Sequence, residues 1–370
     1  MKSKYQSIAD EIRKKILSQE FSKGSVIPTE IQLQEIYAVS RHTVRQAISV
    51  LVNEGYLRRE KGSGTYVEDK YKENVVGKNT DNKTIGVITT YISDYIFPSI
   101  IRGIEKTLKD KGYSLILAST NNDHVQEKEC LERMIELGVD GLIVEPTKSN
   151  QYNPNLATYV TLHEHNIPLV MINAVYEELD SSFICIDDVK TGYLATKELI
   201  INNHKNLLLI TKIDDLQGKY RMKGFMRACG EHEISINSDS IITYTTETEI
   251  EILEIIVAHL KKKEDITGIV CYNDKMANLL ISKLSNIGIK IPENYSIVGI
   301  DNSSLSSIGA INFSSVNHPK EIIGIDAGNW IIEAVETGKN PKNILYDPEI
   351  IQRSSVKMLC ENKVEEKEAF

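Results

Sequence analysis

The hydrophobic positions in the first 55 residues follow the period of an α-helix. Apolar side chains recur every three or four residues in three separate segments, which predicts three amphipathic helices. Gly24 and Pro28 interrupt the pattern between the first two segments, and Ala38 and Val39 form a tight turn before the third. The three stripes are Tyr5, Ile8, Ile12 and Ile16, then Leu33, Ile36 and Tyr37, and then Val44, Ala47, Ile48 and Leu51.

Local start signals agree with these helices. Thr29 and Gln32 have the spacing of a capping box, and Ser40 is a favourable N-cap for the third helix. Beyond this helix, residues 56–59 and 65–67 read as two strands around a glycine-containing turn. Three helices followed by such a hairpin predict a winged helix-turn-helix.

From residue 84 onward, short β-branched runs alternate with helical patterns. Strand and helix in alternation predict parallel sheets, and the chain is long enough for two of them. Two such lobes imply a cleft between them. The runs of the first predicted sheet are 85–88, 114–117, 141–144 and 168–172, and those of the second are 183–186, 207–210, 268–271 and 296–300.

The pattern divides the chain into four parts. We expect a winged helix-turn-helix head at residues 1–69, a linker at 70–82, a two-lobed body at 83–358 and a charged tail at 359–370. The linker is polar and mixed in charge, and it has no sustained period. Any movement of the body must therefore pass through it to reach the head.

Composition and charge narrow the class of protein. The chain has 370 residues and a net charge of −9, yet residues 1–70 carry 12 Lys and Arg against 9 Asp and Glu. A mildly basic head on an acidic body fits a protein whose nucleic-acid contact, if it has one, is confined to the head. The start lacks the apolar core of a signal peptide, no apolar run could span a bilayer, and the five cysteines are scattered. We therefore expect a reduced, cytoplasmic protein without a membrane partner.

The polar face of the third predicted helix carries candidate chemistry. Arg41, His42, Arg45 and Gln46 lie off its apolar stripe, as in a helix that enters the major groove of DNA. A solvated surface helix with two arginines would show the same pattern. The helix alone leaves both interpretations open.

Polar side chains also follow the predicted strands of the body. Ligands of open parallel sheets bind outside the carboxyl ends of the strands, so these positions should border the cleft. Their mixture of polar and aromatic types suits a small polyhydroxylated ligand. Helix capping or turn formation is the alternative for Asn173, Asn273, Asp274 and Asp301. The positions are 91–97, Glu145, Asn173, Lys212 onward, Asn273 and Asp274, and Asp301 and Asn302.

The head resembles the DNA-binding domain of the GntR family of transcription regulators. The matching motifs are Lys4-Tyr5, Pro28-Thr29-Glu30, Val39-Ser40-Arg41, Thr43-Val44-Arg45-Gln46-Ala47, Leu51, Glu54-Gly55 and Gly62-Ser63-Gly64-Thr65-Tyr66-Val67. The resemblance implies that Arg41 and Arg45 reach bases or phosphates, while the wing tip lies along the minor groove. Glu30 would accept from cytosine or orient Arg45, and exposure without DNA contact is the alternative for Lys4, Glu30, His42 and Lys61. The predicted DNA-binding residues are Lys4, Glu30, Ser40, Arg41, His42, Thr43, Arg45, Gln46, Lys61, Gly62, Ser63, Gly64 and Thr65.

The body resembles the effector domain of LacI/GalR regulators, which is similar to periplasmic sugar-binding proteins. The matching motifs are Gly138-Val139-Asp140-Gly141-Leu142-Ile143, Ile186-Asp187-Asp188 with Gly192 and Ala195, Arg221 with Gly224-Phe225, Tyr272-Asn273-Asp274 with Met276-Ala277, Gly299-Ile300-Asp301 and Gln352-Arg353-Ser354. The resemblance implies that the body binds a sugar between its lobes. The effector-binding residues it implies are Tyr95 and Phe97 beside the sugar ring, Glu145 and Asn173 from the first lobe, Arg221, Asn273 and Asp301 from the second, and His318 and Lys320 near a crossover. Aromatic residues are common in the family at the position of Lys320.

The two resemblances together define the predicted fold and function. The fold class is an N-terminal winged helix-turn-helix joined to a two-lobed α/β domain like a periplasmic binding protein, with parallel sheets. The combination resembles the arabinose-responsive repressors of Gram-positive bacteria. It implies a dimer without a cofactor that leaves a two-fold symmetric operator when L-arabinose binds. The alternatives are a sugar sensor that acts through a protein partner, and a regulator that uses another sugar as co-repressor.

Enzymatic function is not expected. The sequence has no GxSxG elbow, no HExxH motif and no P-loop. His163 and His165 are two residues apart, which directs their rings to different sides of a helix, and a solvated turn explains them better than a metal site.

Overall fold

The structure is a computed structural model that describes residues 4–17, 20–60, 63–68, 83–93, 95–309 and 311–360. The predicted linker and nearly all of the predicted tail lie outside these residues, as do Lys61 and Gly62 of the predicted wing. The head and the body are separate units and are described one at a time. In the described residues, no helix combines the length and the apolar character needed to cross a membrane.

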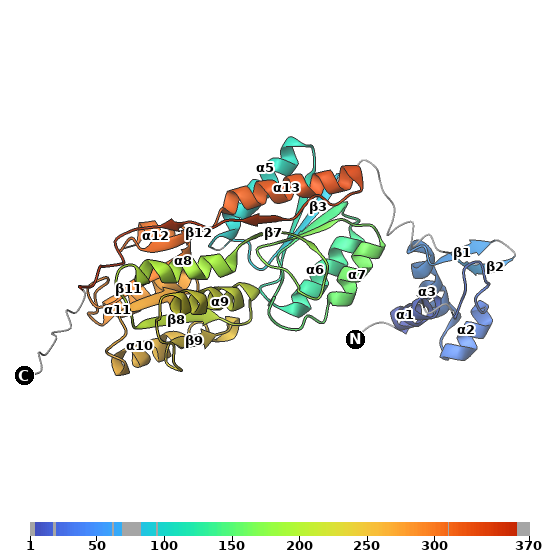
Figure 1. The fold of residues 1–370 in the computed structure, drawn as a ribbon. Helices are drawn as coiled ribbons and strands as arrows, with labels where there is room; N and C mark the ends of the chain where they lie inside the picture. Colours follow the sequence, from blue (N-terminus) through green and yellow to red (C-terminus); the bar gives the residue numbers. More distant parts are fainter. Residues whose placement is uncertain are drawn as a thin grey trace, which may run out of the picture. The chain divides into compact units, whose positions relative to one another are not determined.

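The head contains the predicted helices and hairpin (Figure 1). Its elements are α1 (Lys4–Leu17), α2 (Glu30–Tyr37), α3 (Arg41–Asn53), β1 (Leu57–Glu60) and β2 (Gly64–Val67). The apolar stripes meet in one core that includes Ile12, Leu33, Ile48 and Leu51. Ile36 is an exception to the prediction, because it is 60% exposed and α2 buries only Leu33.

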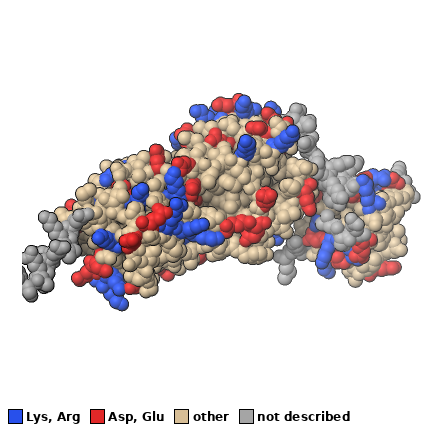
Figure 2. Space-filling view, viewed as in Figure 1, with Lys and Arg blue, Asp and Glu red and all other residues tan. Residues whose placement is uncertain are grey.

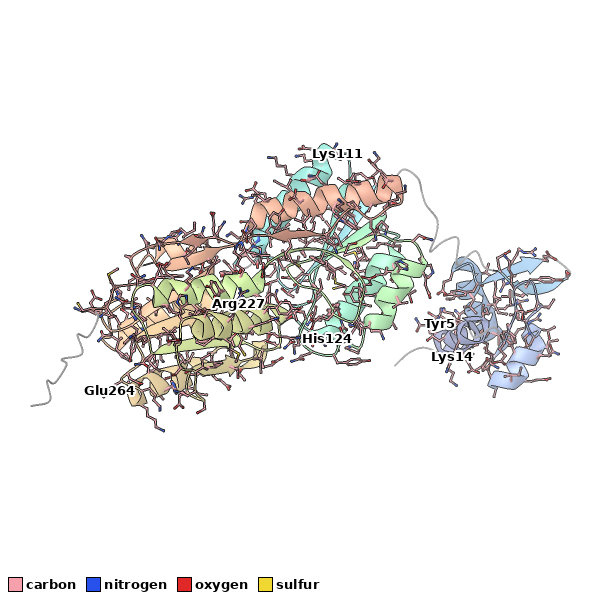
Figure 3. The ribbon with its side chains drawn as sticks, in the orientation of Figure 1. Tyr5, Lys14, Lys111, His124, Arg227 and Glu264 are labelled. Carbon is pink, nitrogen blue, oxygen red and sulfur yellow. The ribbon has the colours of Figure 1, made fainter. Side chains whose placement is uncertain are left out.

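The ends of the head's helices follow the predicted capping. The Thr29 side chain accepts from the backbone N–H of Gln32 at 3.3 Å, and the Gln32 side chain accepts from the backbone of Thr29 at 2.8 Å. Ser40 accepts from the backbone N–H of Thr43 at 3.3 Å and so caps α3. Figure 3 labels Tyr5 and Lys14 on α1, at its beginning and near its end. These local bonds fix where α2 and α3 begin.

The first lobe of the body is built on a sheet of order β13-β7-β6-β5-β3-β4, in which the pairs are parallel. Its strands are β3 (Thr84–Thr89), β4 (Ser114–Ser119), β5 (Gly141–Val144), β6 (Leu169–Ile172), β7 (Ser182–Ile186) and β13 (Ile344–Tyr346). The prediction that 183–186 belongs to the second sheet is wrong. After β6 the chain turns back and pairs Val170 with Ser182, so β7 extends the first sheet.

The second lobe is built on a sheet of order β14-β12-β11-β10-β8-β9, parallel except where β14 pairs with β12. Its strands are β8 (Leu207–Lys212), β9 (Ile241–Tyr244), β10 (Gly268–Cys271), β11 (Ser296–Asp301), β12 (Ser314–Asn317) and β14 (Ile350–Ile351). The sequence patterns predicted β8, β10 and β11, but not β9, β12 or β14.

Helices cover the faces of both sheets (Figure 1). Those of the first lobe are α5 (Phe97–Asp110), α6 (His124–Glu136), α7 (Leu156–Glu164) and α13 (Lys320–Thr337). Those of the second lobe are α8 (Asp188–Ile200), α9 (Leu216–Glu231), η1 (Thr246–Thr248), α10 (Ile252–Lys262), α11 (Asp274–Asn286) and α12 (Leu305–Ile308). The chain passes between the lobes after β7, after β12 and after β13, and these crossings place residues 187, 318 and 347 at the junction.

Glycines allow two helix pairs to approach backbone to backbone. A Cβ on Gly192 of α8 would lie 2.1 Å from the Arg221 carbonyl oxygen of α9, and one on Gly224 would lie 2.0 Å from that of Val189. Gly103 and Gly324 allow the same approach between α5 and α13. Only glycine fits such contacts, since any larger residue would push the helices apart.

Candidate functional site

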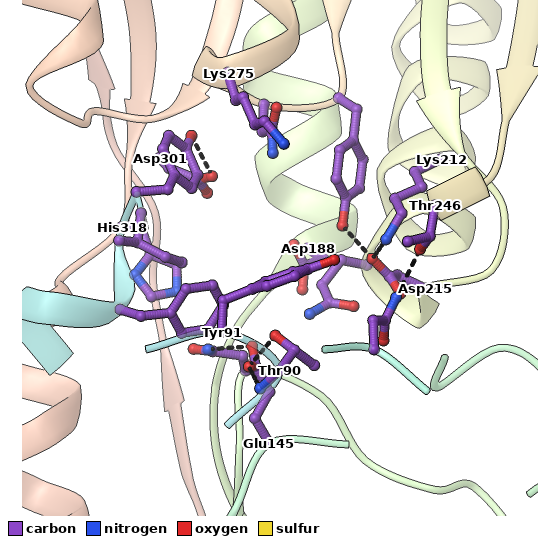
Figure 4. Close-up of a pocket in the computed structure, with 18 of the residues that line it drawn as sticks. Thr90, Tyr91, Glu145, Asp188, Lys212, Asp215, Thr246, Lys275, Asp301 and His318 are labelled. Carbon is purple, nitrogen blue, oxygen red and sulfur yellow. Dashed lines mark hydrogen bonds and ion pairs between the residues drawn. The ribbon is translucent and has the colours of Figure 1, made fainter. Parts of the chain in front are cut away.

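A cavity of about 160 Å³ lies between the two lobes of the body, at the carboxyl ends of the strands (Figure 4). This is the place that the strand-end rule predicts. Its wall combines segments that follow β3, β5 and β6 in the first lobe with segments that follow β8, β10 and β11 in the second. The predicted effector-binding residues on the wall are Tyr95, Phe97, Glu145, Asn173, Arg221, Asn273, Asp301 and His318.

Lys320 differs from the prediction, because it is not among the described residues that line the cavity. Its ammonium group donates to the carbonyl oxygens of Asp301 at 2.6 Å and Asn302 at 3.0 Å. Burial lowers the pKa of Lys320, and the nearby Asp301 carboxylate opposes this shift. Lys320 therefore holds the backbone at the end of β11, next to the cavity.

Arg221 is the best-anchored cation of the wall. Its Nε donates to Asp188 Oδ1 at 2.8 Å, its Nη1 donates to the Tyr272 carbonyl at 2.7 Å, and its Nη2 lies 3.5 Å from Asp301 Oδ1. Burial raises the pKa of Asp188 to about 6, although the guanidinium charge favours its ionised form. The guanidinium carbon also lies 4.9 Å from the centre of the Tyr272 ring. These contacts fix the direction of the Arg221 side chain.

Glu145 is a fully hydrogen-bonded carboxylate at the end of β5. One oxygen accepts from the backbone N–H of Thr90 at 2.9 Å and from its hydroxyl at 2.6 Å, and the other accepts from Asn173 Nδ2 at 2.9 Å. Burial raises the pKa of Glu145, while these donors lower it in part. The Asn173 amide nitrogen is thus used by Glu145, and its Oδ1 atom has no hydrogen-bond partner among the described residues.

Several buried acceptor atoms of the wall have no hydrogen-bond partner among the described residues. They are Asn173 Oδ1, Gln217 Oε1, Asp301 Oδ1 and His318 Nδ1. Burial lowers the pKa of His318 to about 4, so its ring is neutral near pH 7 and one ring nitrogen can accept. Unpaired buried acceptors are costly, and on a cavity wall they indicate a ligand that supplies donors.

The cations on the wall are already paired with carboxylates. Lys212 Nζ lies 2.6 Å from Asp215 Oδ2, and Lys275 Nζ lies 2.6 Å from Glu249 Oε2. Arg221 is held by Asp188 in the same way. Among the described residues that line the cavity, no cation is left free for a phosphate or carboxylate group.

The strand-end rule placed residues 91–97 and Lys212 at the cleft, and Tyr91 and Lys212 do line the wall. Neither was among the predicted effector-binding residues, which also left out the wall residues Asp188, Asp215, Gln217, Tyr272 and Lys275. Figure 4 shows the Tyr91 ring in the middle of the cavity, between His318 and Asp215. The Tyr91 ring centre is 5.8 Å from that of Phe97, which gives the cavity an aromatic surface.

Asn273 satisfies both interpretations of its position. Its side chain accepts from the backbone N–H of Met276 at 2.9 Å, and this bond caps α11. The residue also lines the cavity. The side-chain oxygen of Asn273 is thus used for capping, and its amide nitrogen can donate a hydrogen bond to a ligand.

In the head, α3 presents the predicted basic residues. Arg41 and Arg45 are exposed, and each donates from Nε to Glu30 Oε2, at 2.9 Å and 3.0 Å. Partial burial opposes ionisation of Glu30, but the hydrogen bonds from the two arginines lower its pKa overall. Glu30 therefore holds both guanidinium groups on one side of α3, which agrees with the orienting role considered for it.

The remaining predicted DNA-binding residues occupy three places in the head. Lys4, His42 and Gln46 are exposed, and Thr43 is half-buried. The Ser40 and Thr43 hydroxyls are 2.9 Å apart at the start of α3. On the wing, the Ser63 hydroxyl bonds to that of Tyr66 at 2.5 Å, and Gly64 has a φ of 134° beside Thr65.

Comparisons with known proteins decide the family. Residues 4–67 match the gntR family of bacterial regulatory proteins, and residues 85–367 match the periplasmic binding protein domain. The Arabinose metabolism transcriptional repressors of Halalkalibacterium halodurans and Geobacillus stearothermophilus are each 43% identical to this chain over 96% of its length, covering 97% and 98% of theirs. The chain belongs to this family of transcriptional repressors.

A solved structure supports the fold of the body. The transcription regulator CcpA of Lactococcus lactis is 25% identical to this chain and superimposes with a TM-score of 0.66. The match covers 75% of this chain and 100% of the CcpA chain. The predicted fold class and both predicted resemblances are thus confirmed.

The described residues contain no group of three or more His, Cys, Asp or Glu side chains placed to hold a metal ion. His163 and His165 lie exposed at the end of α7. Figure 2 shows Lys and Arg interspersed with Asp and Glu on the face of the body that it presents.

Proposed function

We propose that this repressor binds operator DNA through its head and leaves it when L-arabinose occupies the cavity of the body. The names of the two relatives point to arabinose, and the chemistry of the wall supports a neutral sugar. The buried acceptor atoms on the wall that lack a hydrogen bond carry the proposal. They come from both lobes, so a ligand that satisfies them holds the lobes in one arrangement.

A small sugar supplies what these acceptors lack. Each sugar hydroxyl can donate one hydrogen bond and accept others. Sugar hydroxyls would donate to Asn173 Oδ1, which belongs to the first lobe, and to Gln217 Oε1 and Asp301 Oδ1, which belong to the second. The aromatic surface of Tyr91 and Phe97 offers a place for the CH face of the ring.

The paired charges favour an unphosphorylated sugar. A phosphate group would have to displace Asp215, Glu249 or Asp188 from its cation, or lie against these carboxylates. Both options are unfavourable in a buried site. We therefore expect the cavity to reject sugar phosphates and sugar acids.

On the DNA side, we propose that Arg41 and Arg45 contact the major groove, with Glu30 holding them in place. Arginine can engage guanine with two hydrogen bonds, and the wing glycines permit close approach to the backbone of the DNA. One head of this size reads a short half-site, so we expect a homodimer on a two-fold symmetric operator. We expect the protein to act in the cytoplasm, where such an operator is accessible.

The proposed switch is a shift between two arrangements of the lobes. The sugar can change operator affinity only by its differential affinity for them, typically about 1 to 3 kcal/mol of coupling. Induction by release is the proposed sign, and tighter operator binding with sugar would indicate co-repression instead.

Calorimetry with the full chain tests the ligand. We expect heat from L-arabinose, weaker heat from other pentoses and hexoses, and none from arabinose 5-phosphate or arabinonate. Asp301→Ala is expected to weaken L-arabinose binding by about 1 to 3 kcal/mol, the usual cost of leaving a polar partner unpaired. Binding of the phosphate with equal affinity, or no binding of any sugar, would contradict the proposal.

A further inference from the structure

The Tyr95 hydroxyl joins the two lobes directly. Tyr95 follows β3 in the first lobe, and its hydroxyl donates to Asp301 Oδ2 at 2.7 Å, with the Ile300 carbonyl 3.1 Å away. The same oxygen accepts the backbone N–H of Asp274 at 3.0 Å. Asp301 ends β11 and Asp274 begins α11, so one hydroxyl holds two elements of the second lobe.

The backbone at both ends of this bond is unusual. Tyr95 has a φ of 61° and Asp301 a φ of 101°, values that residues with a side chain rarely adopt. Such conformations persist where the surrounding contacts hold them, and they cluster at functional sites. Two strained residues thus face each other across the lobe junction.

The bond also determines which Asp301 oxygen faces a ligand. Oδ2 is used by Tyr95, whereas Oδ1 has no hydrogen bond among the described residues and lies 3.5 Å from Arg221 Nη2. The Lys320 ammonium holds the Asp301 carbonyl oxygen at 2.6 Å. Asp301 is therefore held through its backbone by Lys320 and through Oδ2 by Tyr95, and Oδ1 is left for a donor.

We propose that Tyr95 is a positioning residue whose hydroxyl locks Asp301 and the start of α11 to the first lobe, in the arrangement that forms the cavity. The resemblance places Tyr95 beside the sugar ring, a role its ring alone could fill. The hydroxyl adds a separate role, because it links atoms of the two lobes directly. Its effect on the sugar response rests on the proposed function.

Tyr95→Phe removes this hydroxyl and leaves the ring. Tyr295→Phe is the matched control, since the Tyr295 hydroxyl bonds to the Leu260 carbonyl at 3.4 Å within the second lobe, away from the cavity. Circular dichroism and urea unfolding of both variants establish that each is folded.

The first measurement needs no sugar. Amide hydrogen exchange is followed at Asp274, whose N–H loses its acceptor in Tyr95→Phe. A net hydrogen bond of ordinary strength predicts exchange about three- to tenfold faster in Tyr95→Phe, with no change in Tyr295→Phe. Equal Asp274 exchange in the wild type and Tyr95→Phe would overturn the link.

The second measurement follows operator release at saturating L-arabinose. If Tyr95 couples the lobes, Tyr95→Phe leaves a larger fraction of operator bound at saturation, whereas loss of a simple sugar contact only shifts the midpoint. Full release at saturation by Tyr95→Phe would overturn the coupling role. Failure of the wild type to respond to L-arabinose would overturn the proposed function instead, and the exchange measurement would still decide the link.

Discussion

The Arg221 guanidinium and the Asp188 carboxylate lie 2.8 Å apart, and each side chain is only 5% exposed. They belong to α9 and α8, which touch backbone to backbone at Gly192 and Gly224. The helix contact therefore sets the geometry of the ion pair. Because Arg221 also reaches toward Asp301, the packing of these helices determines the shape of the proposed sugar site.

Gly192→Ala tests this dependence. The added Cβ would meet the Arg221 carbonyl oxygen at 2.1 Å, so we expect α8 and α9 to separate, with weaker L-arabinose binding and a loss of stability of about 1 to 3 kcal/mol. Gly230→Ala is the control on the neighbouring helix α9, because nothing lies within 4 Å of its added Cβ. The control should keep its sugar affinity in calorimetry. Unchanged affinity in Gly192→Ala would show that the contact does not set the site.

Removal of Arg221 should lower the free energy of unfolding by more than removal of a charged side chain at the surface does. Arg221→Ala leaves Asp188 buried without its cation, and breaking a buried pair typically costs about 3 to 5 kcal/mol. We expect this loss in urea unfolding at pH 8. The deficit should shrink as the pH is lowered toward 6, because Asp188 without the guanidinium charge takes up a proton at a higher pH than it does in the wild type, where its pKa is about 6. A deficit independent of pH would contradict the pairing.

The buried carboxyl group of Asp274 should make the stability of the body depend on pH. Burial raises its pKa to about 7 in the folded chain, well above the value of an unfolded aspartate. The folded state thus holds a proton that the unfolded state has lost, so this group makes the body more stable as pH falls from about 7 toward 4. The ionisation penalty is fully present above pH 7.

Asp274→Asn should remove this dependence. Between pH 7.5 and 5.5 we expect the wild type to gain about 1 to 2 kcal/mol relative to the variant, as measured by urea unfolding at each pH. His318 acts in the opposite direction at lower pH, because its pKa is lowered to about 4, but it is common to both proteins. Parallel stability profiles for the two proteins would refute the role given to Asp274.

Arg45 is expected to contribute directly to operator affinity. Arg45→Ala should weaken binding by about 1 to 3 kcal/mol at fixed salt. Lys14→Ala removes the same charge from an exposed position on α1 and should have a much smaller effect. Both are measured by fluorescence anisotropy with a duplex selected from random sequence by the full chain. Equal losses in the two variants would indicate a general charge effect without recognition by α3.

The sequence predicted the head almost completely because its signals are local. The stripe Val44, Ala47, Ile48 and Leu51 faces the core, and the Ser40 side chain caps α3 as predicted. Ile36 was misplaced because an eight-residue helix has room for few buried positions, and Leu33 takes that of α2. The register of a short helix depends on what packs against it.

The body was predicted less completely because strand order is not local. The run 183–186 is a clear strand, but its sheet is decided by pairing with β6. β13 and β14 are three and two residues long, too short to show a period. Among the cavity residues, Asn273 and Asp301 follow strands and were found, whereas Asp188 follows a strand that had been placed in the wrong sheet.

Operator release by sugar tests the account most directly. Fluorescence anisotropy of the selected duplex bound to the full chain is followed while L-arabinose is added, with Arg221→Ala in parallel. We expect anisotropy to fall to that of free DNA for the wild type and to remain high for Arg221→Ala at the same sugar concentrations. Anisotropy that stays high for the wild type, although calorimetry shows the sugar bound, would contradict the central claim that the cavity controls the head.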